Sequence, residues 1–266
     1  MLEGMRYLQR KFDRREIAFE AMAASVDARD IAGRNLESPI CIYQMAEELG
    51  ARVVFNDINM EGMYEKGAKP RIHLSTLRPL PRKAFNCAHE LGHHFLGHGT
   101  TIDVLTEDDE WCSNKPEELA ANTFAAFALM PTLGIRNAFS ARGWRPETAT
   151  PAQIYTIASN FGVGYSTLIN HLVIGLGDIS RNRGRLLLRT QPKDIRVLLL
   201  GYPSEHSLHV IDRHLNAQSV DAEIGDLLLA PKNSLIIGSA VVATGISSPG
   251  TLYRATSQGT SVLQWS

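Results

Sequence analysis

The stretch CAHELGHHFLGHGT, residues 87–100, holds four of the nine histidines of this 266-residue chain. It contains the pattern His-Glu-x-x-His, in which His89 and His93 are four residues apart. Residues at that spacing lie on one face of an α-helix, so both rings can reach one metal ion. Glu90 projects beside them, where its carboxylate can take a proton from a water molecule that the ion activates. The stretch therefore predicts a helix that carries a zinc site.

A catalytic zinc ion needs a third protein ligand and an open position. The neighbouring histidines do not suit this role: His94 is off the face, and His98 lies about 140° around the helix from His93. We interpret His98 as a helix-end residue that caps carbonyl groups. Position 99 is a glycine, which excludes the third histidine of metzincins. The third ligand must therefore come from another segment.

The segment PEELAANTFAAFALMP, residues 116–131, offers Glu117 and Glu118 in the first turn of a predicted helix capped by Asn114. The helix face that continues from Glu118 consists mostly of small residues, which allow close helix packing: Ala121, Asn122, Ala125 and Leu129. This spacing favours Glu118 as the third ligand, whereas Glu117 suits a solvated charge. The alternative is that both glutamates only complement the helix dipole.

The chain before residue 180 mixes helices with a few strands. Residues 10–50 are predicted to be helical, and residues 51–58 and 70–75 are β-branched, partly alternating strands. The helix of the histidine pattern is predicted over about residues 82–96. Residues 151–174 predict two short helices that could form a helix-turn-helix. Ordinary helix packing is favoured there, because the segment contains no lysine or arginine to grip phosphates.

The pattern changes near Gly184. The runs RLLLRT, IRVLLLG, LHVID, DLLLAP, SLIIGSAVVAT, TLYRAT and TSVLQW are short, apolar and separated by turn residues. Such runs predict strands of a mainly β domain. We therefore divide the chain into an N-terminal helical extension (1–37), a metal-binding domain (38–180) and a mainly β domain (181–266) that serves as a sensory or partner-binding unit.

Composition narrows the class of protein. A net charge of −1 and a pI near 6.8 argue against a general binder of nucleic acid or membrane surfaces, so direct DNA binding is not expected. No apolar run approaches the roughly 20 residues of a membrane helix, and the charged N-terminus lacks the apolar core of a secretory signal. Three cysteines without paired spacing suit a reducing compartment. These features predict a cytoplasmic protein.

Four stretches carry a family resemblance. ICIYQMAEELGARVVFNDINMEGMY, RIHLS and RKAFNCAHELGHHFLGH, followed by EELAANTFAAFALMP, closely resemble the ImmA/IrrE family of bacterial and phage metallopeptidases over roughly residues 38–174. The resemblance assigns His89, His93 and Glu118 as zinc ligands and Glu90 as the catalytic acid/base. It implies an α+β fold with an antiparallel sheet beside the zinc helices.

The resemblance also implies an activity and a partner. Members of the family act in the cytoplasm, typically by cleaving a helix-turn-helix repressor and thereby derepressing phage, mobile-element or stress-response genes. We therefore expect a zinc-dependent regulatory protease whose substrate is such a repressor. The alternative is a zinc-containing regulator that binds a repressor or DNA without cutting it. The mainly β region lies outside the resemblance.

Overall fold

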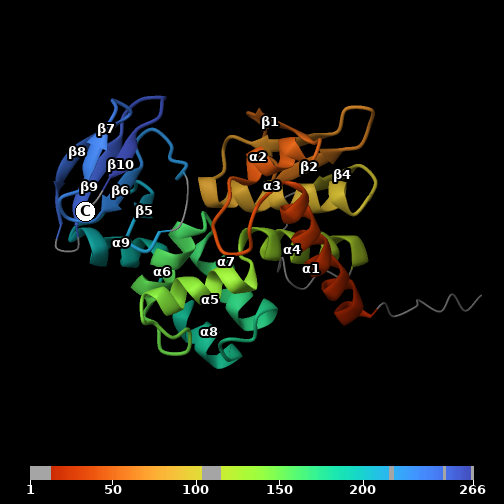
Figure 1. Cartoon of the computed structure of the whole chain (residues 1–266), viewed down its shortest axis with the longest axis horizontal. Helices are drawn as coiled ribbons and strands as arrows, with labels where there is room; N and C mark the ends of the chain where they lie inside the picture. Colours follow the sequence, from red (N-terminus) through yellow and green to blue (C-terminus); the bar gives the residue numbers. More distant parts are fainter. Residues whose placement is uncertain (1–12, 104–114, 216–218, 248–249, 265–266) are drawn as a thin grey trace, which may run out of the picture.

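The computed structural model describes residues 13–103, 115–215, 219–247 and 250–264, and these form an α+β fold. The helices are α1 (Arg14–Ile31), α2 (Ile42–Glu48), α3 (Leu80–Phe95), α4 (Pro116–Leu129), α5 (Thr132–Ala141), α6 (Pro151–Asn160), α7 (Tyr165–Asn170), η1 (His171–Gly175), α8 (Arg181–Leu187) and α9 (Pro192–Leu200). The strands are β1 (Arg52–Asn56), β2 (Gly62–Glu65), β3 (Arg71–Ser75), β4 (Thr101–Asp103), β5 (Leu208–Val210), β6 (Leu227–Ala230), β7 (Leu235–Ile237), β8 (Val241–Ile246), β9 (Thr251–Ala255) and β10 (Val262–Gln264). Figure 1 shows strands β1–β4 toward one end of the molecule and β5–β10 toward the other, with α5–α8 below and between them.

The first sheet has the strand order β1-β3-β2-β4. Strands β3 and β4 both pair antiparallel with β2, as expected, but β1 pairs parallel with β3, so the sheet is mixed and not purely antiparallel. The reason is the path of the chain. After β1 it skips one position to form β2, and the β2–β3 hairpin then places β3 in the gap, running in the same direction as β1.

Helix α3 crosses this sheet and packs against α4. It starts directly after Pro79, with Pro81 in its first turn, where a missing N–H costs nothing. It ends where Gly97 adopts a φ of 76°, a left-handed conformation that favours glycine. Both ends agree with the sequence pattern to within about two residues.

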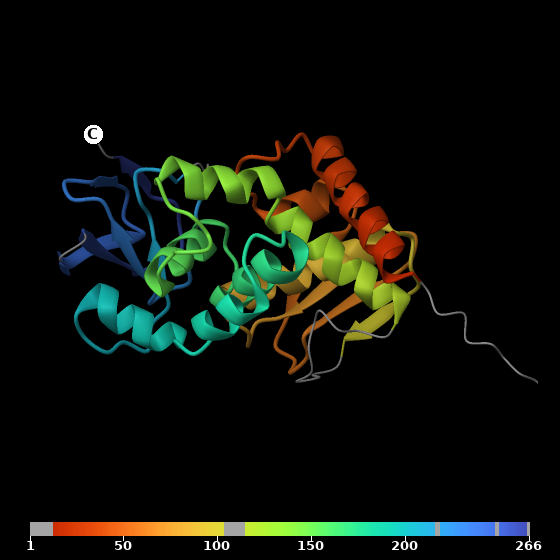
Figure 2. The same cartoon turned by 90° about the horizontal axis from the view of Figure 1, so that it is seen from below.

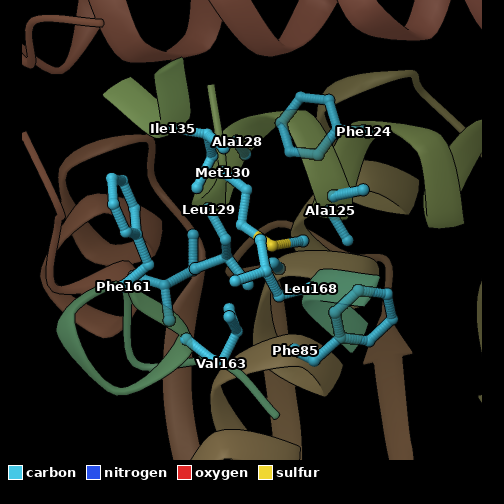
Figure 3. Packing of buried hydrophobic residues seen from close by; sticks show 14 of the residues in the cluster. Phe85, Phe124, Ala125, Ala128, Leu129, Met130, Ile135, Phe161, Val163 and Leu168 are labelled. Atoms are coloured by element: carbon cyan, nitrogen blue, oxygen red, sulfur yellow. The ribbon is translucent and has the colours of Figure 1, made fainter. Parts of the chain in front are cut away.

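Helix α4 is the centre of the main core. Figure 3 shows Phe124, Ala125, Ala128, Leu129 and Met130 from α4 and its end packed among side chains of α3, α5 and the α6–α7 region. The stretch Pro116–Ala141 is long and apolar enough to cross a membrane by length and composition, and 78% of its apolar window is buried inside the fold. Its apolar side chains are thus mostly buried in the core of the protein.

Helix α1 lies against α4 (Figure 2). The side chain of Arg29 is fully buried at this contact. It donates to the backbone oxygens of Asn35, Ser38 (2.7 Å) and Ala128 (2.5 Å), and burial lowers its pKa to about 10. A buried guanidinium needs such acceptors. The N-terminal extension is therefore fastened to the end of α4.

The prediction of strands over residues 185–200 is wrong, because this stretch forms α8 and α9. The start of α8 is capped by Ser180, and α9 starts at Pro192 with a Gln191–Asp194 capping box. The buried Leu187 and Ile195 belong to the main core. The leucine runs are thus faces of short helices, and the described strands of the C-terminal region begin only at residue 208.

The C-terminal strands form a sheet of order β5-β6-β9-β8 and a separate β10–β7 pair. Strand β5 is held against α6 by three hydrogen bonds. Tyr155 donates to the oxygen of Leu208 (2.8 Å), Asn160 donates to the oxygen of Val210 (2.7 Å), and the Val210 N–H donates to the hydroxyl of Ser159 (2.8 Å). The β region is thus attached to the helical part through directional contacts.

A buried histidine lies where α4, α5 and η1 meet. The Nε2–H of His171 donates to the backbone oxygen of Met130 (2.9 Å), and a Cβ on Gly175 would lie 2.4 Å from its Nδ1. The ring is fully buried, and burial lowers the pKa of His171 to about 4. The fold therefore holds this histidine neutral.

This burial predicts a loss of stability in mild acid. An unfolded histidine titrates near 6.5, so between about pH 6.5 and pH 4 the unfolded chain binds a proton that the fold excludes. Between pH 7.5 and pH 5 the parent should lose about 2 kcal/mol more unfolding free energy than His171→Gln, whose amide can still donate to Met130. Urea unfolding at both pH values tests this. An equal loss in both proteins would contradict a neutral His171.

Candidate metal centre

Helices α3 and α4 bring three possible metal ligands together. His89 and His93 lie one turn apart on α3, with 3.0 Å between their Nε2 atoms. Glu118 of α4 places one oxygen 3.3 Å from Nε2 of His89 and the other 3.7 Å from Nε2 of His93. We call these residues the His-His-Glu cluster.

The donor atoms of the cluster fit a small divalent ion. They lie within 4.8 Å of one another, and neighbouring ligands on a tetrahedral zinc ion are about 3.3–3.4 Å apart, given bond lengths of about 2.0–2.1 Å. Two neutral imidazoles and one carboxylate form a donor set that zinc accepts while a fourth position stays open. The side chain of His93 is fully buried, whereas that of Glu118 is 23% exposed. The cluster is therefore reached from the Glu118 side.

The structure distinguishes the two glutamates of the α4 first turn. Glu118 faces the histidines, and hydrogen bonds from His89 and then His93 hold its pKa well below the usual range. Glu117 is exposed to solvent. The expected helix cap Asn114 lies outside the described residues, and the position before α4 is Lys115.

Each histidine of the cluster has a partner on its other nitrogen. Nδ1 of His89 lies 2.8 Å from the side-chain oxygen of Asn122, a member of the small-residue face of α4. Because that oxygen only accepts, the His89 ring donates from Nδ1 and keeps the lone pair of Nε2 for a metal. The close packing expected of this face thus also supplies a polar contact that orients a ring.

His98 has a different role from the one that the sequence indicated. Its Nδ1 lies 2.8 Å from Nδ1 of His93, so the side chain contacts the cluster and does not cap carbonyls. The left-handed Gly97 turns the chain back after α3, and the His98 N–H donates to the oxygen of His93 (2.9 Å). Burial, and then the nearby His93, lower the pKa of His98. The angle predicted for His98 was wrong because it assumed that the helix continues, whereas α3 ends before His98.

Glu90 lies on α3 between the two histidines and is fully buried. The hydroxyl of Thr101, the first residue of β4, donates to its Oε2 (3.1 Å). Gly62 of β2 faces its other oxygen, and a Cβ there would lie 2.6 Å from Oε1. The sheet therefore fixes the carboxylate beside the cluster, through two residues that no sequence motif identified.

The remaining histidines lie elsewhere. Nδ1 of His94 is 3.0 Å from the hydroxyl of Tyr64, and Nε2 is 3.2 Å from the oxygen of Leu49, so this ring joins α3 to β2 and to the end of α2. In the β region, His209 pairs with Asp226 at 2.9 Å. These rings have satisfied structural partners.

Comparison with known families places this site in context. Residues 46–172 match the family model of the IrrE N-terminal-like domain, peptidase family M78, and this range contains the whole His-His-Glu cluster and Glu90. These residues form an IrrE N-terminal-like domain. The resemblance to the ImmA/IrrE family is thereby confirmed, and peptidases of this family are metal-dependent. The match ends within η1, before α8 and the C-terminal strands.

A solved structure described as a Mycobacterium tuberculosis transcriptional regulator is similar over 59% of this chain, with 17% sequence identity and a TM-score of 0.36. The match covers 46% of that regulator, so the chain spans less than half of its length. No curated protein matches the chain.

The geometry of the IrrE-like domain depends on how closely α3 and α4 approach. A Cβ on Gly92 would lie 3.1 Å from Cα of Ala121 and 3.2 Å from Cβ of Phe124. Gly92→Ala should therefore push the helices apart and lower the unfolding free energy by about 1–3 kcal/mol. Chemical unfolding measures this, with Gly99→Ala as the matched control because no atom lies within 4 Å of its Cβ position. Equal stability of the two variants would refute the close-packing argument.

Proposed function

We propose that this chain is a zinc-dependent endopeptidase in which His89, His93 and Glu118 hold the ion and Glu90 is the acid/base. The observation that carries the proposal is the convergence of three buried or half-buried donors beside a separate, fixed carboxylate. A structural zinc site would use a fourth protein ligand. Among the described residues the group contains three.

Each residue has a distinct task in peptide hydrolysis. When bound, zinc supplies Lewis acidity, which lowers the pKa of water and polarises the scissile carbonyl. Glu90 accepts the proton of the attacking water and later delivers it to the leaving amine. Thr101 holds Oε2 of Glu90, and Gly62 leaves the space that the carboxylate occupies. Asn122 keeps His89 in the tautomer that offers Nε2.

Strand β4 suggests how a substrate is held. It ends the sheet order β1-β3-β2-β4, so its outer edge has no strand partner among the described residues. Its first residue, Thr101, also contacts Glu90. An extended peptide that pairs with this edge would pass beside the catalytic carboxylate.

The substrate that we propose is a helix-turn-helix transcriptional repressor, cut at few sites in the cytoplasm. The family resemblance supports this, together with a net charge of −1 that gives no sign of direct DNA binding. A regulatory protease must avoid general proteolysis, and the buried position of Glu90 and His93 restricts access to the site. We further propose that the C-terminal β region selects the partner or senses a signal.

The ligand assignment predicts a difference between neighbouring glutamates. The parent should bind about one zinc ion per chain. Glu118→Ala should lose most of this zinc, because it removes one of three ligands, whereas Glu117→Ala should retain it, because Glu117 is exposed. Metal analysis after dialysis measures both. Zinc retention in Glu118→Ala with loss in Glu117→Ala would show that the wrong carboxylate is assigned.

The activity is tested by co-expression with the repressor encoded beside the gene. The parent should cut this repressor, and Glu90→Gln should keep its zinc but cleave about 100- to 10,000-fold more slowly, since an amide accepts no proton. Glu117→Gln is the matched control and should cut normally. Casein should be a poor substrate. Broad casein degradation would favour a general peptidase, and tight repressor binding without a cut product would favour a binding regulator.

A further inference from the structure

A cavity of about 530 Å³ lies between the IrrE-like domain and the C-terminal region. We call it the junction cavity. Its wall comes from the starts of α2 and α3, from α6, α7 and α9, and from the segments before β5 and around residues 219–221. Its volume lies within the roughly 300–1,000 Å³ typical of small-molecule sites. None of the His-His-Glu cluster lines it.

One side of the junction cavity is apolar. Phe85, Leu129, Phe161 and Val163 line it, and Figure 3 shows these side chains as members of the main core. Tyr165 adds an aromatic ring to the same lining. Such a surface favours a ligand with an apolar or aromatic body.

The polar side of the cavity contains buried polar atoms that lack a hydrogen-bond partner. Within the described part of the chain, Oη of Tyr43 and Nε of Arg196 are buried and make no hydrogen bond. Both residues line the cavity. Arg196 hydrogen-bonds to Tyr155, and its charge partly offsets the burial that raises the pKa of the Tyr155 hydroxyl. A permanently charged guanidinium with a free buried N–H favours a carboxylate, sulfonate or phosphate.

The other charges around the cavity do not cancel this preference. Glu205 and Asp221 line it and are exposed to solvent, but Asp221 lies close enough to Tyr43 to add to the burial that raises the pKa of its hydroxyl. Arg82 also lines the cavity, but its guanidinium pairs at 2.8 Å with Glu61, which is not a lining residue. The cavity lining is therefore cationic at Arg196, whereas the part near Tyr43 also faces the carboxylate of Asp221.

We propose that the junction cavity binds a small amphipathic anion, with its apolar body against Phe161 and Phe85 and its acidic group at Arg196. Binding itself does not depend on the proposed peptidase activity. The expected ligand is an aromatic or aliphatic acid of roughly drug size.

The position of the cavity lets a bound ligand contact the two helices that carry the His-His-Glu cluster. Phe85 lies on α3 one turn before His89, and Leu129 ends the helix α4 that begins beside Glu118. A bound molecule would contact both helices of the His-His-Glu cluster and also α9 of the C-terminal region. Occupancy should therefore change the affinity of the cluster for zinc, a consequence that rests on the proposed function.

The probe is 8-anilinonaphthalene-1-sulfonate, whose fluorescence rises when its rings are buried, added to the full-length zinc-loaded protein. We expect saturable binding at one site. Arg196→Gln should weaken it about tenfold or more, because one charge-assisted contact is lost. Lys193→Gln is the matched control, since it removes an exposed charge from the same helix outside the cavity. The uncharged probe N-phenyl-1-naphthylamine should bind equally to the parent and to Arg196→Gln.

Two variants fill the cavity from different helices, Ala84→Phe on α3 and Thr167→Phe on α7. Whichever of them keeps the parent melting temperature should lose the bound probe. Unsaturable fluorescence, or equal binding by the parent, Arg196→Gln and the folded filling variant, would mean surface adsorption only and would overturn the proposal. If the anion binds as expected but zinc affinity does not change, the binding site stands and its coupling to the metal centre is wrong.

Discussion

The close contact of α3 with α4 is the constraint on which the candidate site depends. Gly92 has no side chain, so Ala121 and Phe124 can approach the α3 backbone to within van der Waals contact. This approach carries Glu118 to the ring nitrogens of His89 and His93 from a different helix. It also lets Asn122 reach His89. A metal centre built from two helices needs this fixed spacing, because a displacement of an ångström would separate the donor atoms.

The residues of this contact could be predicted because their signals are periodic. His89 and His93 share a helix face, and the small residues after Glu118 repeat at helical spacing. Gly62 and Thr101 could not be predicted, since they reach Glu90 from strands whose register depends on the folded sheet. The prediction for His98 was wrong for a related reason. A helical-wheel argument does not extend past Gly97, where the chain reverses.

The C-terminal region shows where local pattern is ambiguous. Short leucine runs over residues 185–200 fit a strand or a short helix, and the deciding features are the caps at Ser180 and Gln191. The resulting helices place Leu187 and Ile195 in the main core. The helical part of the fold thus extends beyond the expected limit at residue 180. The chain leaves α9 through the left-handed Gly201 before the C-terminal strands begin.

Burial at the cluster also bears on selectivity. The side chain of His93 and the whole of Glu90 are inaccessible to solvent, whereas Glu118 is partly exposed at the start of α4. The outer edge of β4, which pairs with no other strand within the described ranges, belongs to the sheet that contacts Glu90. A peptide bond inside a folded protein cannot pair with this edge, because its backbone already pairs within its own structure. Only a segment that is extended, or that unfolds locally, can pair with the β4 edge and present its carbonyl to the cluster. The proposed protease would therefore choose its substrates by local unfolding and docking, and less by the sequence at the cut.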